Sequence, residues 1–352
     1  PEWARSHEMR GTLHTMISAG GRVFAIMDEG ITGQRAGVPS EWTLIARDAF
    51  NGNRLWKRSA SRIQPSLLVA SGDRVYVALG GGAPVSILDA ATGETLASCE
   101  NTTHAAEIIC HQKIVVCRIE NRKQQRRSSN EQSQGLVAVD GQTGKLLWSK
   151  QNRVESLAAR AERICYHNGG ELVCLTLDGK EQWKTSCDTN DCIVMVNDVV
   201  LLVGGKPVEA FSARTGDLLW KGSLRSRRLP GIFAAGGLVW SAWPHGEPHP
   251  VGRTMNWEPC ASVRNGYDVV TGEMKKTVSV ERLVTPGHHI RCYLPKATSR
   301  YLLLNKRGVE FFDLEGDNHM RHDWLRPGCG YGAMPANGFL YVPPSPCFCY
   351  PG

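Results

Sequence analysis

The chain has 352 residues, of which 41% are hydrophobic, and it carries 41 Lys and Arg against 34 Asp and Glu. This hydrophobic content is enough for a sizeable core and excludes wholesale disorder. The length exceeds that of most single domains and indicates either two domains or one large closed array of strands. No apolar run approaches the roughly 18–20 residues of a membrane span, so we expect no membrane-spanning segment. The chain begins at Pro1 without a secretory signal, as expected of a trimmed form or a piece of a longer chain.

The net charge of +7 comes from two short basic clusters. One is the polar stretch 120–134 (ENRKQQRRSSNEQSQ), and the other contains Arg225, Arg227 and Arg228. The remaining charges balance, so the clusters predict solvated loops. No basic run is interleaved with aromatic residues, so we expect no nucleic-acid partner.

Variants of a short phrase, Asp-x-x-Thr-Gly followed by an apolar run, recur along the chain. The phrases contain seven glycines: Gly52, Gly93, Gly144, Gly179, Gly216, Gly272 and Gly316. Their mean spacing is about 44 residues, so a chain of 352 residues would hold eight units. In four units a tryptophan follows the glycine by four residues: Trp56, Trp148, Trp183 and Trp220.

Each phrase is typical of a tight turn between two strands, because glycine adopts positive φ and an Asp side chain accepts hydrogen bonds from turn amides. Two further strands with period-two alternation precede the phrase, as in 73–80 (DRVYVALG) and 198–205 (DVVLLVGG). No helical period intervenes. The sequence therefore predicts an all-β fold, an eight-bladed β-propeller of four-stranded antiparallel blades. We expect the repeat tryptophans to pack between neighbouring blades.

The ends of the chain leave the number of blades open. Residues 12–30 begin the first unit, whereas 332–352 add only two or three strands after the last phrase. We expect one propeller domain over residues 1–352 whose last blade is closed by the N- and C-terminal segments, with 1–10 supplying the outer strand. Seven blades with spare terminal strands are the alternative.

The phrases LDAATGETL (88–96), VDGQTGKLLW (139–148) and SARTGDLLW (212–220) resemble the repeat of pyrroloquinoline-quinone-type propellers. That repeat occurs in quinoprotein dehydrogenases and in the lipoprotein of the outer-membrane β-barrel assembly machinery. The terminal segments are also similar to uncharacterised bacterial repeat proteins, many from planctomycetes. The resemblance implies a periplasmic or extracellular propeller, often part of a longer chain or complex. Quinone-binding members carry adjacent cysteines, and this chain has no such pair, so we expect no bound quinone.

Twelve cysteines require an explanation in a β protein. Cys187 and Cys192 bracket a tight loop that suits a small disulfide in an oxidising compartment. Cys165 and Cys174 are predicted to face each other across a hairpin, with buried thiols as the alternative to a bond. Disulfides, free thiols and a metal site, such as one for zinc, all remain open for four cysteines of the last two units: Cys292, Cys329, Cys347 and Cys349.

Three regions are candidate sites, because propellers bind ligands in the central channel or on loops of one face. In 287–298 (GHHIRCYLPKAT), His288 or His289 beside Arg291 is the candidate for proton abstraction. The candidates for binding come from this region, from the insertion 241–266 and from the first unit: Asp28, Glu29, Arg47, Lys296, His245 and His249. No resident cofactor is expected, although calcium or zinc remains open.

The leading functional hypothesis is an extracytoplasmic scaffold that binds a protein or an anionic polysaccharide. One alternative is a polysaccharide lyase or hydrolase that uses His288, His289 and Arg291. Another is a quinoprotein-type oxidoreductase. The chain contains no Gly-rich phosphate loop, G-x-S-x-G elbow or H-E-x-x-H motif, so whether it is an enzyme stays open.

Overall fold

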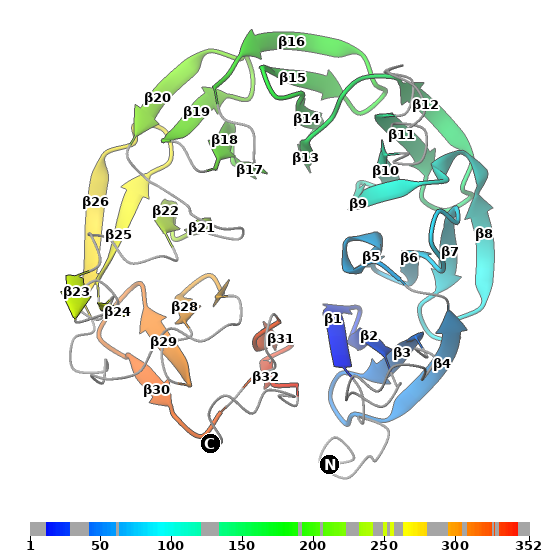
Figure 1. Cartoon of the computed structure of the whole chain (residues 1–352), viewed down its shortest axis with the longest axis horizontal. Coiled ribbons are helices and arrows are strands. Elements are labelled where there is room, and N and C mark those ends of the chain that lie inside the picture. Colours follow the sequence, from blue (N-terminus) through cyan, green and yellow to red (C-terminus); the bar gives the residue numbers. More distant parts are fainter. Residues whose placement is uncertain are drawn as a thin grey trace. The chain divides into compact units, whose positions relative to one another are not determined.

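The protein is built from β-strands, as the computed structural model shows (Figure 1). Among the residues that the structure describes, the helical segments are two 3₁₀ turns, Pro65–Leu67 and Glu100–Thr102. Neither has the length and apolar character needed to cross a membrane. The described residues are 12–28, 42–60, 63–120, 134–188, 192–204, 207–222, 232–241, 249–251, 254–256, 263–279, 295–304, 308–325, 327 and 331–343.

Two compact units divide the chain, one of residues 1–168 and 173–182 and one of residues 169–172 and 183–352. The first unit holds three complete antiparallel sheets whose strands follow one another in sequence order. They are β1 (Thr12–Ala19), β2 (Arg22–Asp28), β3 (Trp42–Asp48) and β4 (Arg54–Ala60); β5 (Leu68–Ser71), β6 (Arg74–Ala78), β7 (Val85–Asp89) and β8 (Thr95–Cys99); and β9 (Ala105–His111), β10 (Ile114–Glu120), β11 (Gln134–Asp140) and β12 (Leu146–Lys150).

A fourth sheet begins in the first unit and follows the same strand order. Its strands are β13 (Ser156–Arg160), β14 (Arg163–His167), β15 (Glu171–Thr176) and β16 (Glu181–Ser186). Successive sheets of the first unit meet through their first strands, since β1 contacts β5, β5 contacts β9 and β9 contacts β13. In Figure 1 the fourth strands β4, β8 and β12 lie on the opposite side of their sheets from these first strands.

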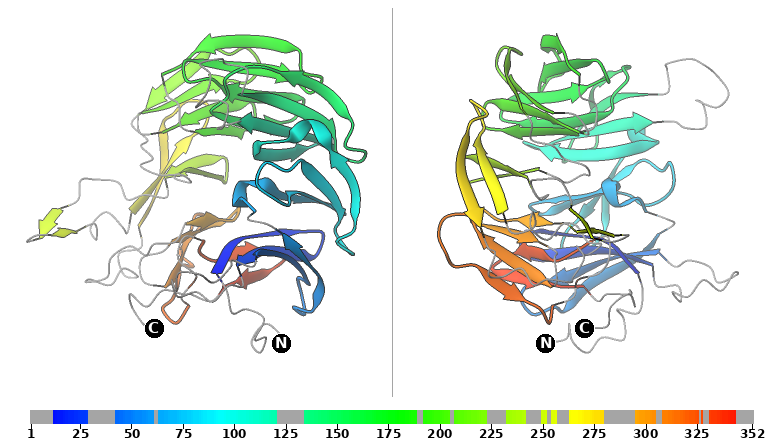
Figure 2. Two further views of the ribbon diagram at one scale, coloured as in Figure 1. Left: turned by 45° about the vertical axis from the view of Figure 1, so that its right-hand side comes forward. Right: turned by 60° about the vertical axis from the view of Figure 1, so that its left-hand side comes forward.

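The second unit holds three more sheets with the same order. They are β17 (Cys192–Val196), β18 (Val199–Val203), β19 (Val208–Ser212) and β20 (Leu218–Gly222); β21 (Ile232–Ala235), β22 (Leu238–Ser241), β25 (Val263–Asp268) and β26 (Met274–Ser279); and β27 (Lys296–Ala297), β28 (Tyr301–Leu304), β29 (Val309–Asp313) and β30 (Met320–His322). Between β22 and β25 the insertion forms a small hairpin of β23 (His249–Val251) and β24 (Thr254–Asn256), which projects from the unit in Figure 2.

The described residues thus form a β-propeller with seven complete four-stranded blades, the number given above as the alternative. The eighth unit expected from the repeat length is a two-stranded hairpin of β31 (Met334–Ala336) and β32 (Phe339–Tyr341). This hairpin packs against the seventh blade, where Leu340 and Val342 join the cluster around Leu303 and Val309. Residues 1–10, predicted to complete the last blade, lie outside the described residues, so that closure stays a prediction.

Burial differs between the strands of a blade as their sequences predict. All five residues of β18 are buried, and β14 and β22 have a single partly buried residue each. The outer strands β12 and β20 instead alternate exposed and partly buried residues over their last three positions. This alternation fits a strand with one face against the neighbouring sheet and the other in solvent.

The recurring phrase forms the turn between the third and fourth strands. The carboxylate of Asp89 accepts hydrogen bonds from the backbone N–H groups of Ala91 and Thr92, at 2.8 and 2.9 Å. The same pair of bonds recurs at three further turns, those of Asp48, Asp140 and Asp268. These backbone bonds favour the ionised form and lower the pKa of each carboxyl group. The predicted turn chemistry is confirmed.

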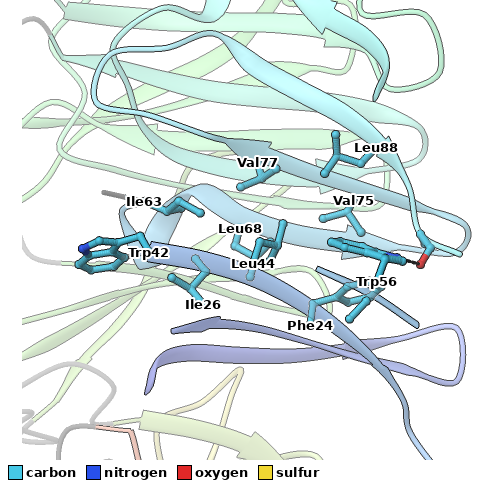
Figure 3. Close-up of a cluster of buried hydrophobic side chains, with 12 residues drawn as sticks. Phe24, Ile26, Trp42, Leu44, Trp56, Ile63, Leu68, Val75, Val77 and Leu88 are labelled. Carbon is cyan, nitrogen blue, oxygen red and sulfur yellow. Dashed lines mark hydrogen bonds between the residues drawn. The ribbon is translucent and has the colours of Figure 1, made fainter. Parts of the chain in front are cut away.

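The core lies between successive sheets, and the cluster between the first two shows how it is built. Phe24 and Leu44 of the first blade pack with Val75 and Val77 of the second, and all four are fully buried (Figure 3). Trp56 on β4 closes one end of this cluster. Stacking therefore buries faces that a single sheet would leave in water.

Each repeat tryptophan joins its own blade to the next one in sequence. The Nε1–H of Trp56 donates to the carbonyl oxygen of Ala90 at 3.0 Å (Figure 3). The Trp56 ring also covers Gly93, where a Cβ would lie 2.6 Å from an indole carbon. Equivalent bonds join Trp148 to Leu177, Trp183 to Ala213 and Trp220 to Val269. Packing between blades, as predicted for these tryptophans, is confirmed.

Lys276 takes the tryptophan position in the sixth blade. It lies four residues after Gly272, and its ammonium donates to the carbonyl oxygens of Leu314 at 2.6 Å and Glu315 at 3.4 Å. A lysine thus makes the hydrogen bond to the next blade that an indole N–H makes elsewhere. The sequence analysis did not predict this contact. The one signal for it in the sequence is that Lys276, like the repeat tryptophans, lies four residues after the phrase glycine.

Candidate functional site

The predicted catalytic residues, the candidate metal ligands and two of the predicted binding residues lie outside the described residues, and their roles stay predictions. They are, for catalysis, His288, His289 and Arg291; for a metal, Cys292, Cys329, Cys347 and Cys349; and for binding, Glu29 and His245. His249 is placed by its backbone alone, opposite Asn256 in the β23–β24 hairpin. Among the residues that the structure does place, no group of three or more His, Cys, Asp or Glu is arranged to hold a metal ion.

Asp28 and Arg47, predicted as one charged site, lie at opposite ends of the first blade. Along β2 and β3, Asp28 is opposite Trp42 and Arg47 is opposite Val23. Along β2, Asp28 is five residues from Val23, the residue opposite Arg47, which corresponds to a distance of about 17 Å along the strand. Arg47 is buried and donates to the carbonyl oxygen of Gly52 at 2.8 Å. Arg47 therefore stabilises the turn of the first phrase.

Lys296 is the predicted binding residue whose surroundings suit a ligand. It lies on β27 opposite Leu303, and its Nζ is 4.8 Å from the centre of the Tyr331 ring. Tyr331 precedes β31, which contacts β27, so the packing of the hairpin brings the two residues together. An ammonium this close to an aromatic ring is attracted by the ring quadrupole.

Burial lowers the pKa of Lys296, and no charged neighbour contributes to the change. Lys221 is the opposite case, because its ammonium lies 2.7 Å from Asp188 and 3.0 Å from Glu209, and these carboxylates raise its pKa. Lys296 therefore carries a half-buried charge that no carboxylate among the described residues balances. The sequence indicated Lys296 but not Tyr331, since nothing local links the two segments.

A tight ion pair stabilises the turn of the seventh blade. Arg300 donates from Nε and Nη2 to the two oxygens of Asp313, at 3.0 and 2.8 Å, and the Asp313 side chain is fully buried. The backbone N–H groups of Glu315 and Asn318 also donate to this carboxylate. The hydrogen bonds from Arg300 lower the pKa of Asp313. Arg300 immediately precedes β28, so these bonds join the β27–β28 connection to the phrase turn after β29, and we assign the pair a structural role.

The described cysteines are thiols. Cys165 and Cys174 are both fully buried and share a hydrogen bond, so the prediction that they face each other is confirmed. That hydrogen bond and burial raise the pKa of Cys165. Burial raises the pKa of Cys187 to about 11. The predicted disulfide between Cys187 and Cys192 is not formed in the structure and stays a prediction.

Comparison with known proteins places the repeat in a family. The family described as outer membrane protein assembly factor BamB matches residues 40–164 and 132–242, together more than half of the chain. The chain belongs to this family. No curated protein matches the sequence.

Solved structures share the fold of this BamB-family chain at low sequence identity. The BamB structure from Moraxella catarrhalis is 15% identical, with a TM-score of 0.53 over 89% of this chain and 85% of that one. A computationally designed protein, Ika8, is 14% identical, with a TM-score of 0.63 over 94% and 92%. A europium-containing methanol dehydrogenase is 10% identical, with a TM-score of 0.56 over 91% and 80%. At these identities the likeness supports the fold alone.

The outer strands of this BamB-family propeller expose apolar side chains at a repeated position, two or three residues after the phrase glycine. In the first unit they lie on β4, β8 and β12, with exposed fractions between 42% and 48%: Leu55, Leu96, Leu146 and Leu147. In the second unit they lie on β20 and β26, with exposed fractions between 39% and 57%: Leu218, Leu219 and Met274. We call these seven residues the outer apolar positions.

Proposed function

We propose that the chain is an extracytoplasmic scaffold module that binds a protein partner through its outer apolar positions. The observation that carries the proposal is the recurrence of exposed apolar side chains, two or three residues after the phrase glycine, in five of the seven complete blades that the structure describes. Leu55 is 42% exposed although the next residue, Trp56, is 8% exposed against the neighbouring blade. The strand thus has a separate apolar residue on its solvent side.

Single exposed leucines are common on protein surfaces and need no partner. Repetition is what distinguishes these positions, because an exposed apolar side chain adds little to blade stability and yet recurs on the outer strands of five blades, as leucine in four and methionine in one. Interfaces depend on apolar anchors that become buried when the partner binds. A row of them on outer strands suits a partner that spans several blades.

The family description supports an extracytoplasmic location, since it names a factor in outer membrane protein assembly. Cys187 and Cys192 would form their predicted disulfide in such a compartment. Mass spectrometry of the protein purified without reductant from its natural source is expected to show this bond. A reduced Cys187 in that sample would contradict the location.

Two charge variants test the partner site. Leu146→Lys with Leu147→Lys replaces two outer apolar positions, whereas Gln142→Lys adds a charge at an exposed residue of the same hairpin. The proteins are tagged and recovered from cells that naturally make them. We expect a partner that co-purifies stoichiometrically with the wild type and Gln142→Lys and is lost from the double variant. Equal recovery with all three proteins would refute the proposed surface, provided their circular dichroism melts agree.

A further inference from the structure

Lys296 differs from the other described lysines whose pKa is shifted, because burial shifts its pKa and a neighbouring carboxylate shifts theirs. Lys180 lies 2.9 Å from Asp178 and Lys275 lies 2.6 Å from Glu273, and each carboxylate balances the ammonium beside it. The Lys296 ammonium is partly buried against Tyr331, with no carboxylate within ion-pair distance among the described residues. The aromatic ring stabilises this charge but does not neutralise it.

A half-buried charge that has lost part of its hydration attracts an anion more strongly than an exposed one, because the local dielectric is lower. A carboxylate is the matching ligand, since it carries one negative charge and accepts short charge-assisted hydrogen bonds from an ammonium. The Tyr331 ring beside the ammonium offers an apolar surface to the body of that ligand. Both features suit a carboxylate attached to a sugar ring.

We propose that Lys296 and Tyr331 bind the carboxylate of a sugar acid, a hexuronate. Lys296 holds the anion, and Tyr331 orients the ammonium and contacts the sugar. The inference goes beyond the proposed protein scaffold, because Lys296 is not among the outer apolar positions. Failure of one proposal therefore leaves the other intact.

Competitive acetylation tests the site without knowledge of the natural ligand. A trace of acetic anhydride labels neutral lysine amines at pH 8, and peptide mass spectrometry compares Lys296 with the exposed Lys275. The probe is the methyl glycoside of glucuronic acid, which has no free aldehyde, and methyl glucoside is the matched neutral sugar. At about ten times its Kd the glucuronide is expected to slow labelling of Lys296 about tenfold and to leave Lys275 unchanged.

Three results would overturn the proposal. They are no protection by the glucuronide, equal protection by methyl glucoside, and protection by inorganic sulfate as strong as that by the glucuronide. Titration calorimetry of two variants adds a separate measurement. Lys296→Met is expected to keep the wild-type melting temperature and lose glucuronide binding, and Lys275→Met is expected to keep both. Wild-type affinity in Lys296→Met would place the ligand elsewhere and refute the site.

Discussion

Replacing Gly93 tests the contact between the first two blades. Gly93 has φ of +76°, so an alanine there costs about 1–2 kcal/mol from the backbone conformation alone. Its Cβ would also lie 2.6 Å from the indole of Trp56, and such overpacking costs a further 1–3 kcal/mol or so. We therefore expect Gly93→Ala to lower the free energy of unfolding by about 2–5 kcal/mol.

A double-mutant cycle separates the two contributions. Trp56→Ala alone is expected to cost about 3–5 kcal/mol, because it removes a large buried ring. In that background Gly93→Ala should cost only the backbone component, which leaves a coupling energy of about 1–3 kcal/mol. Urea unfolding followed by circular dichroism measures all four proteins. Gly72→Ala is the control, since Gly72 has φ of +59° and no atom near its Cβ position. A Gly93→Ala cost that is the same with and without Trp56 would refute the proposed contact.

Three further changes have expected outcomes. Lys276→Met should lower the free energy of unfolding by about 1 kcal/mol through its lost bonds to the seventh blade, and a loss no larger than that in Lys275→Met would contradict this role. Arg300→Met should lower the free energy of unfolding, because it leaves the buried Asp313 carboxylate beside backbone donors only; a urea midpoint equal to that of the wild type would contradict this. The phrase turns, in which an Asp carboxylate accepts hydrogen bonds from backbone N–H groups, predict that stability depends on pH in acid. Folding lowers the pKa of such a carboxyl, so the ionised group stabilises the fold above its unfolded pKa of about 3.9, and this stabilisation is lost as the pH falls through the folded pKa. The urea concentration at the unfolding midpoint should therefore decrease as the pH is lowered below 4, and it should decrease less steeply in Asp89→Asn. The same dependence on pH in the variant and the wild type would refute this role of Asp89.

The turn and strand pattern could be predicted because it is local. Asp89 and Gly93 lie within one turn, and their bonds and backbone angles depend on few other residues. The number of complete blades follows from the same rule, since each phrase is the turn between a third and a fourth strand and there are seven phrases. Dividing the chain length by the mean spacing of the glycines predicted an eighth unit. The sequence after the seventh phrase contains no further phrase, and in the structure it forms the β31–β32 hairpin.

The candidate site could be predicted only in part, because its contacts join distant segments. Lys296 was identified from its basic neighbours in the sequence, whereas Tyr331 reaches it through packing of the hairpin against β27. Asp28 and Arg47 were grouped by charge, but strand register separates them. Lys276 replaces an indole at the blade contact, a substitution that apolar patterning cannot detect.

Photocrosslinking in cells that naturally make the protein tests the central functional claim most directly. A photoreactive phenylalanine analogue is placed at Leu147 or, as the control, at Gln142 of the same hairpin. Irradiation should join the Leu147 variant to a partner in one adduct of reproducible mass and give no such adduct from Gln142. Absence of an adduct at Leu147, or the same adducts from both positions, would contradict a partner that docks on the outer apolar positions.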